Sequence, residues 1–188
     1  MRKFAREPGM LLAFAPFIAF AVLNHFLSPT AALTVAALVS FGLIGKELLS
    51  GHSAKMLEVG TCVLFGGLAA YAFLTNADWP IVGVKLAVDA GLFAIVLISL
   101  LIRRPFTIQY ARETVPQELW ASPQFFRTNQ VITLVWLAAF AAIIAADLIL
   151  LYLPDVPHKI SVFLTIGALY GAYKFTMSYP ETARAGAR

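Results

Sequence analysis

Charge is scarce in this chain. Only 13% of its 188 residues are Asp, Glu, Lys or Arg, whereas 60% are hydrophobic. Soluble globular domains carry about 25% charged residues. The composition, with a mean hydropathy of +0.81, therefore excludes an ordinary water-soluble domain and predicts a membrane protein.

Cysteine and histidine are scarce as well. The single cysteine, Cys62, excludes an internal disulfide framework and is typical of a small buried apolar residue. The three histidines, His25, His52 and His158, do not have the spacing of zinc or haem ligands, so no metal site is predicted. The sequence also lacks G-x-S-x-G, H-E-x-x-H and P-loop patterns, so we expect no cofactor and no catalytic residues.

Long apolar runs are what the sequence has in abundance. A helix needs ~20 apolar residues to cross ~30 Å of hydrocarbon, and backbone groups in lipid must bond within their own segment. Since these runs lack the alternation of a barrel strand, they are predicted to be helices. The predicted fold is all-α: a polytopic membrane helical bundle that forms a single membrane domain over residues 1–188. The six predicted transmembrane helices are about 10–27, 30–50, 56–75, 81–102, 131–153 and 160–178.

Serine followed by proline predicts two helix starts. At Ser28-Pro29 and Ser122-Pro123 a hydroxyl can cap the helix, and proline suits the first helical position. The second start would lie about two turns before its apolar run. Asp78 and Pro80 precede the run at 81–102 in a similar way.

Basic residues are distributed unevenly between the two ends of the predicted spans. Lys85 and Lys159 lie towards one side, whereas the other lysines and arginines lie towards the opposite side. By the positive-inside rule, both termini and residues 103–130 are predicted to be cytoplasmic. These residues and anionic lipid also explain the net charge of +4, so no nucleic-acid partner is expected.

Among the few ionisable residues within the predicted spans, three stand out, namely Lys85, Asp89 and Asp147. A charge near the bilayer centre costs ~2.5–3.5 kcal/mol or more, so such groups pair with one another or serve transport. Lys85 and Asp89 are one helical turn apart, and Asp147 is expected at a similar depth. The three residues are predicted to form an intramembrane polar network. A structural ion pair is favoured over a proton or cation relay, because the cytoplasmic half of these spans is mostly apolar.

Other charged and small residues have simpler interpretations. Charged residues near the helix ends can reach the lipid headgroups; they are Lys46, Glu47, Glu58 and Lys174. Small residues allow close helix packing; they are Gly167 and Gly171 in a G-x-x-x-G pattern, and Gly60, Gly66 and Gly67 in the third run.

Residues 103–130 form the longest polar segment, which we call the cytoplasmic elbow. Arg103 and Arg104 would end the fourth span at the headgroups, and Pro105 stops the helix. The following residues fit either helical or strand spacing. The segment could be an inert connector, but aromatic residues with polar tips suit a membrane interface. Its predicted partner or lipid surface consists of Arg104, Gln109, Tyr110, Arg112, Glu113 and Trp120.

Several short sequences follow one another in a characteristic order. They are FAPF at 14–17 after a basic tail, FGGL at 65–68, Trp79 before the fourth span, Arg104-Pro105 with Ile108-Gln109, ETVPQELW at 113–120, and then Asn129, Trp136 and Phe140. With this order and spacing, nearly the whole chain resembles the intracellular septation protein A family of bacterial inner-membrane proteins.

The resemblance implies an integral, multi-pass protein of the bacterial cytoplasmic (inner) membrane. Its implied role is that of an interaction or scaffold component of the cell envelope, linked to septation, cell division and wall synthesis. The partners would be membrane lipids and other membrane proteins of the envelope machinery, and a homo-oligomer is also open. No catalytic residue set is implied, so the protein is not expected to be an enzyme.

Two alternatives come from other functional classes. One is a small transporter or ion channel that uses Lys85, Asp89 and Asp147. The other is a membrane enzyme acting on a lipid or quinone at the cytoplasmic face, where only Glu58, Glu113 and Glu118 could serve as acid or base.

Overall fold

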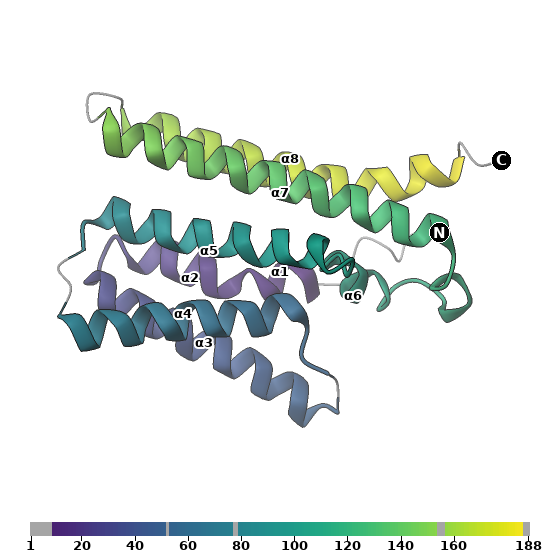
Figure 1. The fold of residues 1–188 in the computed structure, drawn as a ribbon, viewed down its shortest axis with the longest axis horizontal. Coiled ribbons are helices and arrows are strands. Elements are labelled where there is room, and N and C mark those ends of the chain that lie inside the picture. Colours follow the sequence, from purple (N-terminus) through teal and green to yellow (C-terminus); the bar gives the residue numbers. More distant parts are fainter. Residues whose placement is uncertain (1–8, 52, 77–78, 154–156, 186–188) are drawn as a thin grey trace. The chain divides into compact units, whose positions relative to one another are not determined.

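The computed structural model describes residues 9–51, 53–76, 79–153 and 157–185. Within these ranges all regular structure is helical and no strand is present, as the sequence predicts. His52 and Asp78 lie outside the described residues. Figure 1 shows the helices in chain order. They are α1 (Gly9–Ala13), α2 (Ala15–Leu23), α3 (Pro29–Leu49), α4 (Met56–Thr75), α5 (Ile81–Leu101), α6 (Thr107–Ala111), a short 3-10 helix η1 (Gln117–Leu119), α7 (Pro123–Tyr152) and α8 (His158–Ala185).

Among the described residues, five helices are long and apolar enough to cross a membrane, namely α3, α4, α5, α7 and α8. The chain is therefore a multi-pass membrane protein. The run at 10–27 differs from the prediction of one continuous span, because it is divided into α1 and α2 at Phe14. Pro16 explains the division: it has no N–H to donate to the carbonyl of Leu12, so the regular helix bond is missing there.

Serine caps begin α3 and α7 as predicted. The Ser28 hydroxyl accepts a hydrogen bond from the Ala31 N–H at 3.3 Å, and the Ser122 hydroxyl accepts one from the Phe125 N–H at 3.1 Å. The helix α7 consequently starts well before its apolar span, in agreement with the sequence. The predicted span at 56–75 also has the bounds of α4.

The chain divides into two compact units, one covering Pro8–Ile95 and the other Val96–Arg188. We call them the N-terminal unit and the C-terminal unit and describe each by itself. That the whole chain forms a single membrane domain stays a prediction.

Aromatic rings from α2 and α4 lie at the core of the N-terminal unit. The ring centroids of Phe17 and Phe20 lie 5.1 and 5.8 Å from that of Phe65, which is fully buried. Such tilted aromatic pairs stabilise packing by ~0.5–1.5 kcal/mol beyond their buried area. Leu33 from α3 and Val84 from α5 complete this core.

Two glycines allow α4 and α5 to approach closely. A Cβ at Gly60 would lie 2.8 Å from Cγ2 of Ile95, and a Cβ at Gly91 would collide with the side chain of Leu64. The predicted role of Gly60 in helix packing is therefore confirmed. A Cβ at Gly67 would have no neighbour within 4 Å, so this glycine makes no close helix contact among the described residues.

In the C-terminal unit, α7 and α8 pack against each other. The indole N–H of Trp136 donates a hydrogen bond of 2.9 Å to the hydroxyl of Thr176, which in turn donates to the carbonyl of Ala172 at 2.8 Å. A Cβ at Gly167 or Gly171 would meet nothing within 4 Å among the described residues, so the G-x-x-x-G pattern is not used in this pair.

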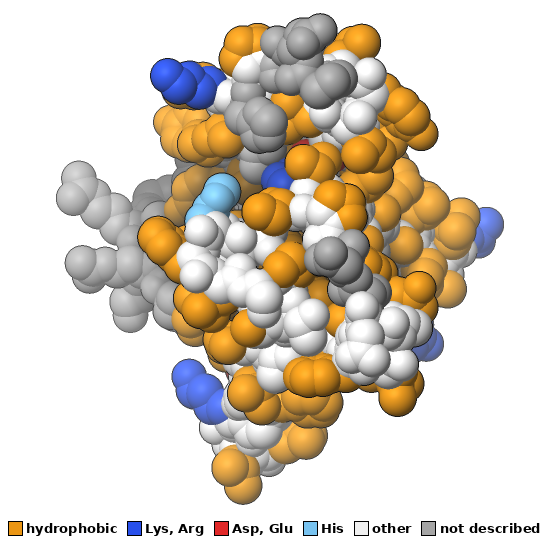
Figure 2. Space-filling model, turned by 90° about the vertical axis from the view of Figure 1, so that its left-hand side faces the viewer, with side chains coloured by type: hydrophobic (Ala, Val, Ile, Leu, Met, Phe, Trp, Pro, Cys, Tyr) orange, Lys and Arg blue, Asp and Glu red, His pale blue; other side chains and the backbone are white. Residues whose placement is uncertain are grey.

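The surface of the described residues is rich in apolar side chains. On the face shown in Figure 2, hydrophobic side chains predominate and charged ones are few. Several large apolar side chains are highly exposed. Phe163 on α8 is 73% exposed, and Leu74 on α4 is 84% exposed. Exposure of this kind suits contact with lipid and not with water.

Candidate functional site

The elbow, residues 103–130, begins at an unusual helix end. The Arg104 N–H donates to the Ser99 carbonyl at 2.8 Å, and the Arg103 N–H donates to the Leu100 carbonyl at 3.0 Å. This pair of bonds is the Schellman arrangement, in which glycine usually takes the left-handed position. Here Arg103 takes that position, with φ of +55°. The left-handed conformation costs a residue with a Cβ about 1–2 kcal/mol.

Ser99 connects α5 to the start of the elbow. Its buried hydroxyl donates to the Val96 carbonyl at 2.7 Å and accepts from the Phe106 N–H at 3.3 Å. The Phe106 side chain is itself fully buried. The chain after Pro105 is therefore fixed to the C-terminal unit and does not extend freely into water.

A buried hydroxyl pair connects the elbow to α7. The Thr107 hydroxyl donates to the carbonyl of Asn129 at 3.0 Å and lies 2.9 Å from the hydroxyl of Thr133. Because the single proton of Thr107 goes to the carbonyl, the Thr133 hydroxyl must be the donor in their mutual bond. All three residues are buried, so these bonds are made away from water and hold α6 against α7.

The outer part of the elbow is folded around Trp120. Its indole N–H donates to the Val115 carbonyl at 2.9 Å, and the guanidinium carbon of Arg112 lies 5.1 Å from the ring centroid. This distance is within the range of a cation–π interaction. The question that the sequence left open is thus answered: residues 107–111 are helical, and residues 112–122 form turns with one short 3-10 helix.

The predicted surface of the elbow is only partly exposed. Arg104, Arg112 and Glu113 are exposed, whereas Gln109 and Trp120 are half-buried. Tyr110 corrects the prediction, because it is 7% exposed and packs edge-on against Phe106 with ring centroids 6.3 Å apart. It serves the packing of the elbow and is not part of its surface. The spacing of residues could not show this. The segment fits a helix and a strand equally well, and the two alternatives place Tyr110 on different faces.

One ion pair among the residues of the predicted polar network is present, on α5. The Lys85 ammonium lies 2.9 Å from Oδ2 of Asp89, one turn along α5, and both side chains are partly buried. Asp147 is fully buried on α7, in the C-terminal unit. The pairing within α5 is as expected, and the network of three residues stays a prediction.

A second charged cluster was missed by the sequence analysis. The Lys55 ammonium lies 3.5 Å from Oε1 of Glu47 and 3.5 Å from Oε1 of Glu58, and Lys55 and Glu58 are both buried. Glu58 also accepts the backbone N–H of Lys55 at 3.1 Å, which caps α4. The expectation that Glu58 reaches the headgroups is therefore wrong. A glutamate at the third helical position was the signal that could have indicated this capping role.

These charged groups do not form a candidate metal site among the described residues. Within the described residues, no three His, Cys, Asp or Glu side chains come together in a way that could hold a metal ion. The side chains that the elbow and the charged pairs offer can form hydrogen bonds, stack on aromatic rings and attract anions.

Together the fold and the elbow define a class, that of an all-helical multi-pass membrane protein with a folded segment between two of its long helices. Comparison with known protein families, curated proteins and solved structures finds no match for the chain.

Proposed function

We propose that the chain is an integral protein of the bacterial inner membrane that acts as an interaction or scaffold component in septation and wall synthesis. In this proposal it has six spans, with α1 and α2 together making the first, and both termini are cytoplasmic. The resemblance in short sequence patterns and the distribution of basic residues support it. The partners are membrane lipids and other membrane proteins of the envelope machinery.

The observation that carries the proposal is the order of the elbow. Ordering a backbone costs ~1–2 kcal/mol per residue, and a plain connector between two helices needs only a few residues. Here buried hydrogen bonds from Ser99 and Thr107 hold the segment from the inside. Its outer side presents Arg112 and Trp120 in contact with each other. Arginine and tryptophan dominate binding energy in many protein interfaces, so a preformed pair of this kind suits recognition.

The experiment compares two variants that each lose one positive charge. Arg112→Gln removes the guanidinium over Trp120, whereas Lys174→Gln removes an exposed charge on α8 and serves as the control. A fluorescent fusion of the full chain is followed in dividing cells, and its cross-linked envelope proteins are quantified by mass spectrometry. We expect septal enrichment and cross-links in the control, and a reduction of at least about fivefold for Arg112→Gln, which corresponds to ~1 kcal/mol of lost contact. Unchanged enrichment and cross-linking in Arg112→Gln would refute the proposal.

A small transporter or channel is the second candidate, because Asp147 is fully buried in an apolar helix. Buried carboxylates in membrane spans commonly mark ion or proton pathways. The purified chain in liposomes is tested for proton or monovalent cation flux, with Asp147→Asn as the variant. Flux that the substitution stops would favour this function, and absence of flux from the unsubstituted protein would exclude it.

A further inference from the structure

An open recess lies where α5 ends and α7 begins. It has a volume of about 270 Å³ and is lined by Leu100, Arg103, Pro105, Phe126 and Gln130, all in the C-terminal unit. Leu100 belongs to the last turn of a membrane-crossing helix, so the recess lies where hydrocarbon gives way to headgroups. Its lining is mixed, with apolar side chains beside one cation and one amide.

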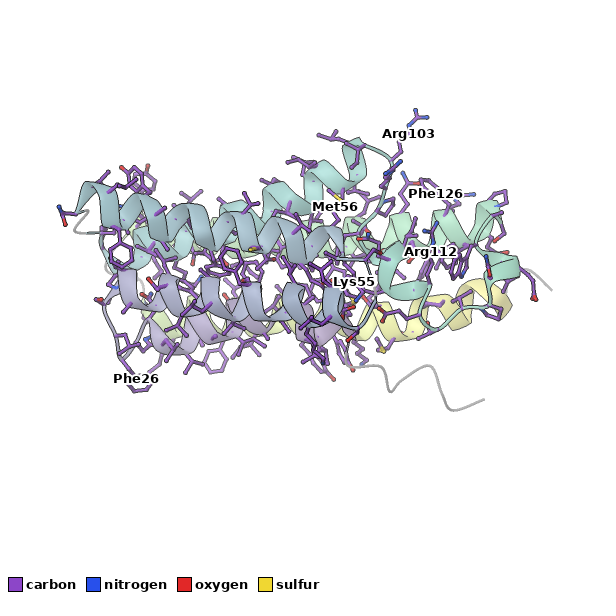
Figure 3. The ribbon with its side chains drawn as sticks, turned by 90° about the horizontal axis from the view of Figure 1, so that it is seen from below. Phe26, Lys55, Met56, Arg103, Arg112 and Phe126 are labelled. Carbon is purple, nitrogen blue, oxygen red and sulfur yellow. The ribbon has the colours of Figure 1, made fainter. Side chains whose placement is uncertain are left out.

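Arg103 is the unusual member of this lining. Its left-handed backbone, with φ of +55°, is a position that glycine occupies without strain. A residue with a Cβ held in this conformation at a surface position is a ground for the hypothesis that its side chain has a function. In Figure 3 the Arg103 side chain extends outward from the end of α5, and Arg103 and Phe126 both line the recess. The left-handed turn thus presents the guanidinium at the rim of the recess.

The charge at this rim is available to a ligand. Among the described residues, the Arg103 guanidinium has no hydrogen bond or ion pair, in contrast to Arg112, which stacks on Trp120. The elbow as a whole carries four arginines and two glutamates, which gives it a net charge of +2. A guanidinium binds phosphate oxygens with two parallel hydrogen bonds, and the cytoplasmic face of a membrane is rich in anionic phospholipid.

From these observations we propose that the recess binds the headgroup of an anionic phospholipid. Arg103 holds the phosphodiester, Gln130 donates a hydrogen bond to the phosphate or glycerol oxygens, and Leu100, Pro105 and Phe126 contact the start of the acyl chains. This lipid site is separate from the proposed partner surface at Arg112. It rests on the orientation given in the proposed function, which places the elbow at the cytoplasmic face of the membrane.

Arg103→Gly is a sharp test, because glycine removes the guanidinium and relieves the left-handed strain at the same time. Lys174→Gln is the control for general electrostatic attraction, since it also removes one exposed positive charge. The full chain is placed in nanodiscs of mixed phosphatidylcholine and phosphatidylglycerol. Retained lipids are counted by native mass spectrometry, and thermal unfolding is recorded for each variant.

We expect Arg103→Gly to keep or raise its unfolding temperature while retaining about tenfold less phosphatidylglycerol than Lys174→Gln. Equal retention by these two variants would overturn the proposal. Should Arg103→Gly fail to fold, Gln130→Leu decides, with severalfold lower retention supporting the site and unchanged retention overturning it. Added inorganic phosphate should not displace the lipid, and displacement by it would show a site for soluble phosphate instead. If Arg103→Gly retains less phosphatidylglycerol but its septal enrichment is unchanged, the lipid site is independent of the proposed scaffold role.

Discussion

Gly60→Ala is a direct test of the close approach between α4 and α5. A Cβ at this position would lie 2.8, 2.9 and 3.0 Å from Cγ2, Cγ1 and Cδ1 of Ile95. The two nearer atoms are attached to the branched Cβ of isoleucine, which has one strongly preferred χ1 rotamer in a helix. The neighbour therefore cannot rotate away cheaply, and either Ile95 or the helix itself must shift.

Two opposing terms set the size of the effect. Overpacking by one methyl group costs ~1–3 kcal/mol, whereas replacing glycine by alanine inside a helix gains ~1 kcal/mol. The net effect of Gly60→Ala is therefore a loss between ~0 and ~2 kcal/mol. Gly67→Ala lies on the same helix and would meet nothing within 4 Å, so it should gain ~1 kcal/mol. The difference between the two variants, ~1–3 kcal/mol, is free of the propensity term.

The assay is reversible unfolding of the full chain in mixed micelles, with the denaturing detergent as the variable. Ile95→Ala removes all three contacting atoms, so Gly60→Ala in that background should behave like Gly67→Ala. This cycle isolates the coupling between the two positions. If Gly60→Ala and Gly67→Ala have the same free energy of unfolding in the unsubstituted background, the close helix approach is wrong.

Two further predictions concern polar contacts between or within helices. Glu58→Gln should lower the free energy of unfolding by about 2 kcal/mol, because the buried Lys55 ammonium then loses the charge of a carboxylate that is itself buried. An unchanged value in the micelle assay would contradict the buried cluster. Trp136→Phe should lower the free energy of unfolding by ~1 kcal/mol, because its hydrogen bond to Thr176 is lost. Thr176→Val added to this variant should lower it little further. Fully additive losses would count against the bond.

Local chemistry accounts for what the sequence predicts well. Ser28 and Ser122 each cap the helix that follows, and Arg103 with Pro105 ends α5, because these effects depend on neighbours within one turn. The break at Phe14 was also within reach of the sequence, since Pro16 removes a helix bond wherever it stands in a helix interior. The prediction followed the continuous apolar run and therefore treated residues 10–27 as one helix.

Contacts between distant residues account for what could not be predicted. Thr107 bonds to Asn129 and Thr133, which are 22 and 26 positions further along the chain, and no periodicity relates such positions. The same holds for Lys55, whose contact with Glu47 requires the turn between α3 and α4 to bring the two together. Tyr110 became a buried residue through these tertiary contacts, although its sequence context equally suits a surface aromatic.

Both proposals for the C-terminal unit depend on the backbone geometry at the end of α5. Ser99 points inward and fixes Phe106, while Arg103, one turn later, turns the chain and carries its charge outward. A glycine at 103 would make the same turn, so the turn alone does not require arginine. The fold of the elbow depends on the turn, whereas the proposed lipid site depends on the guanidinium. Substitutions at Ser99 should therefore disturb the partner surface first, whereas Arg103→Gly should affect lipid retention and leave the elbow folded.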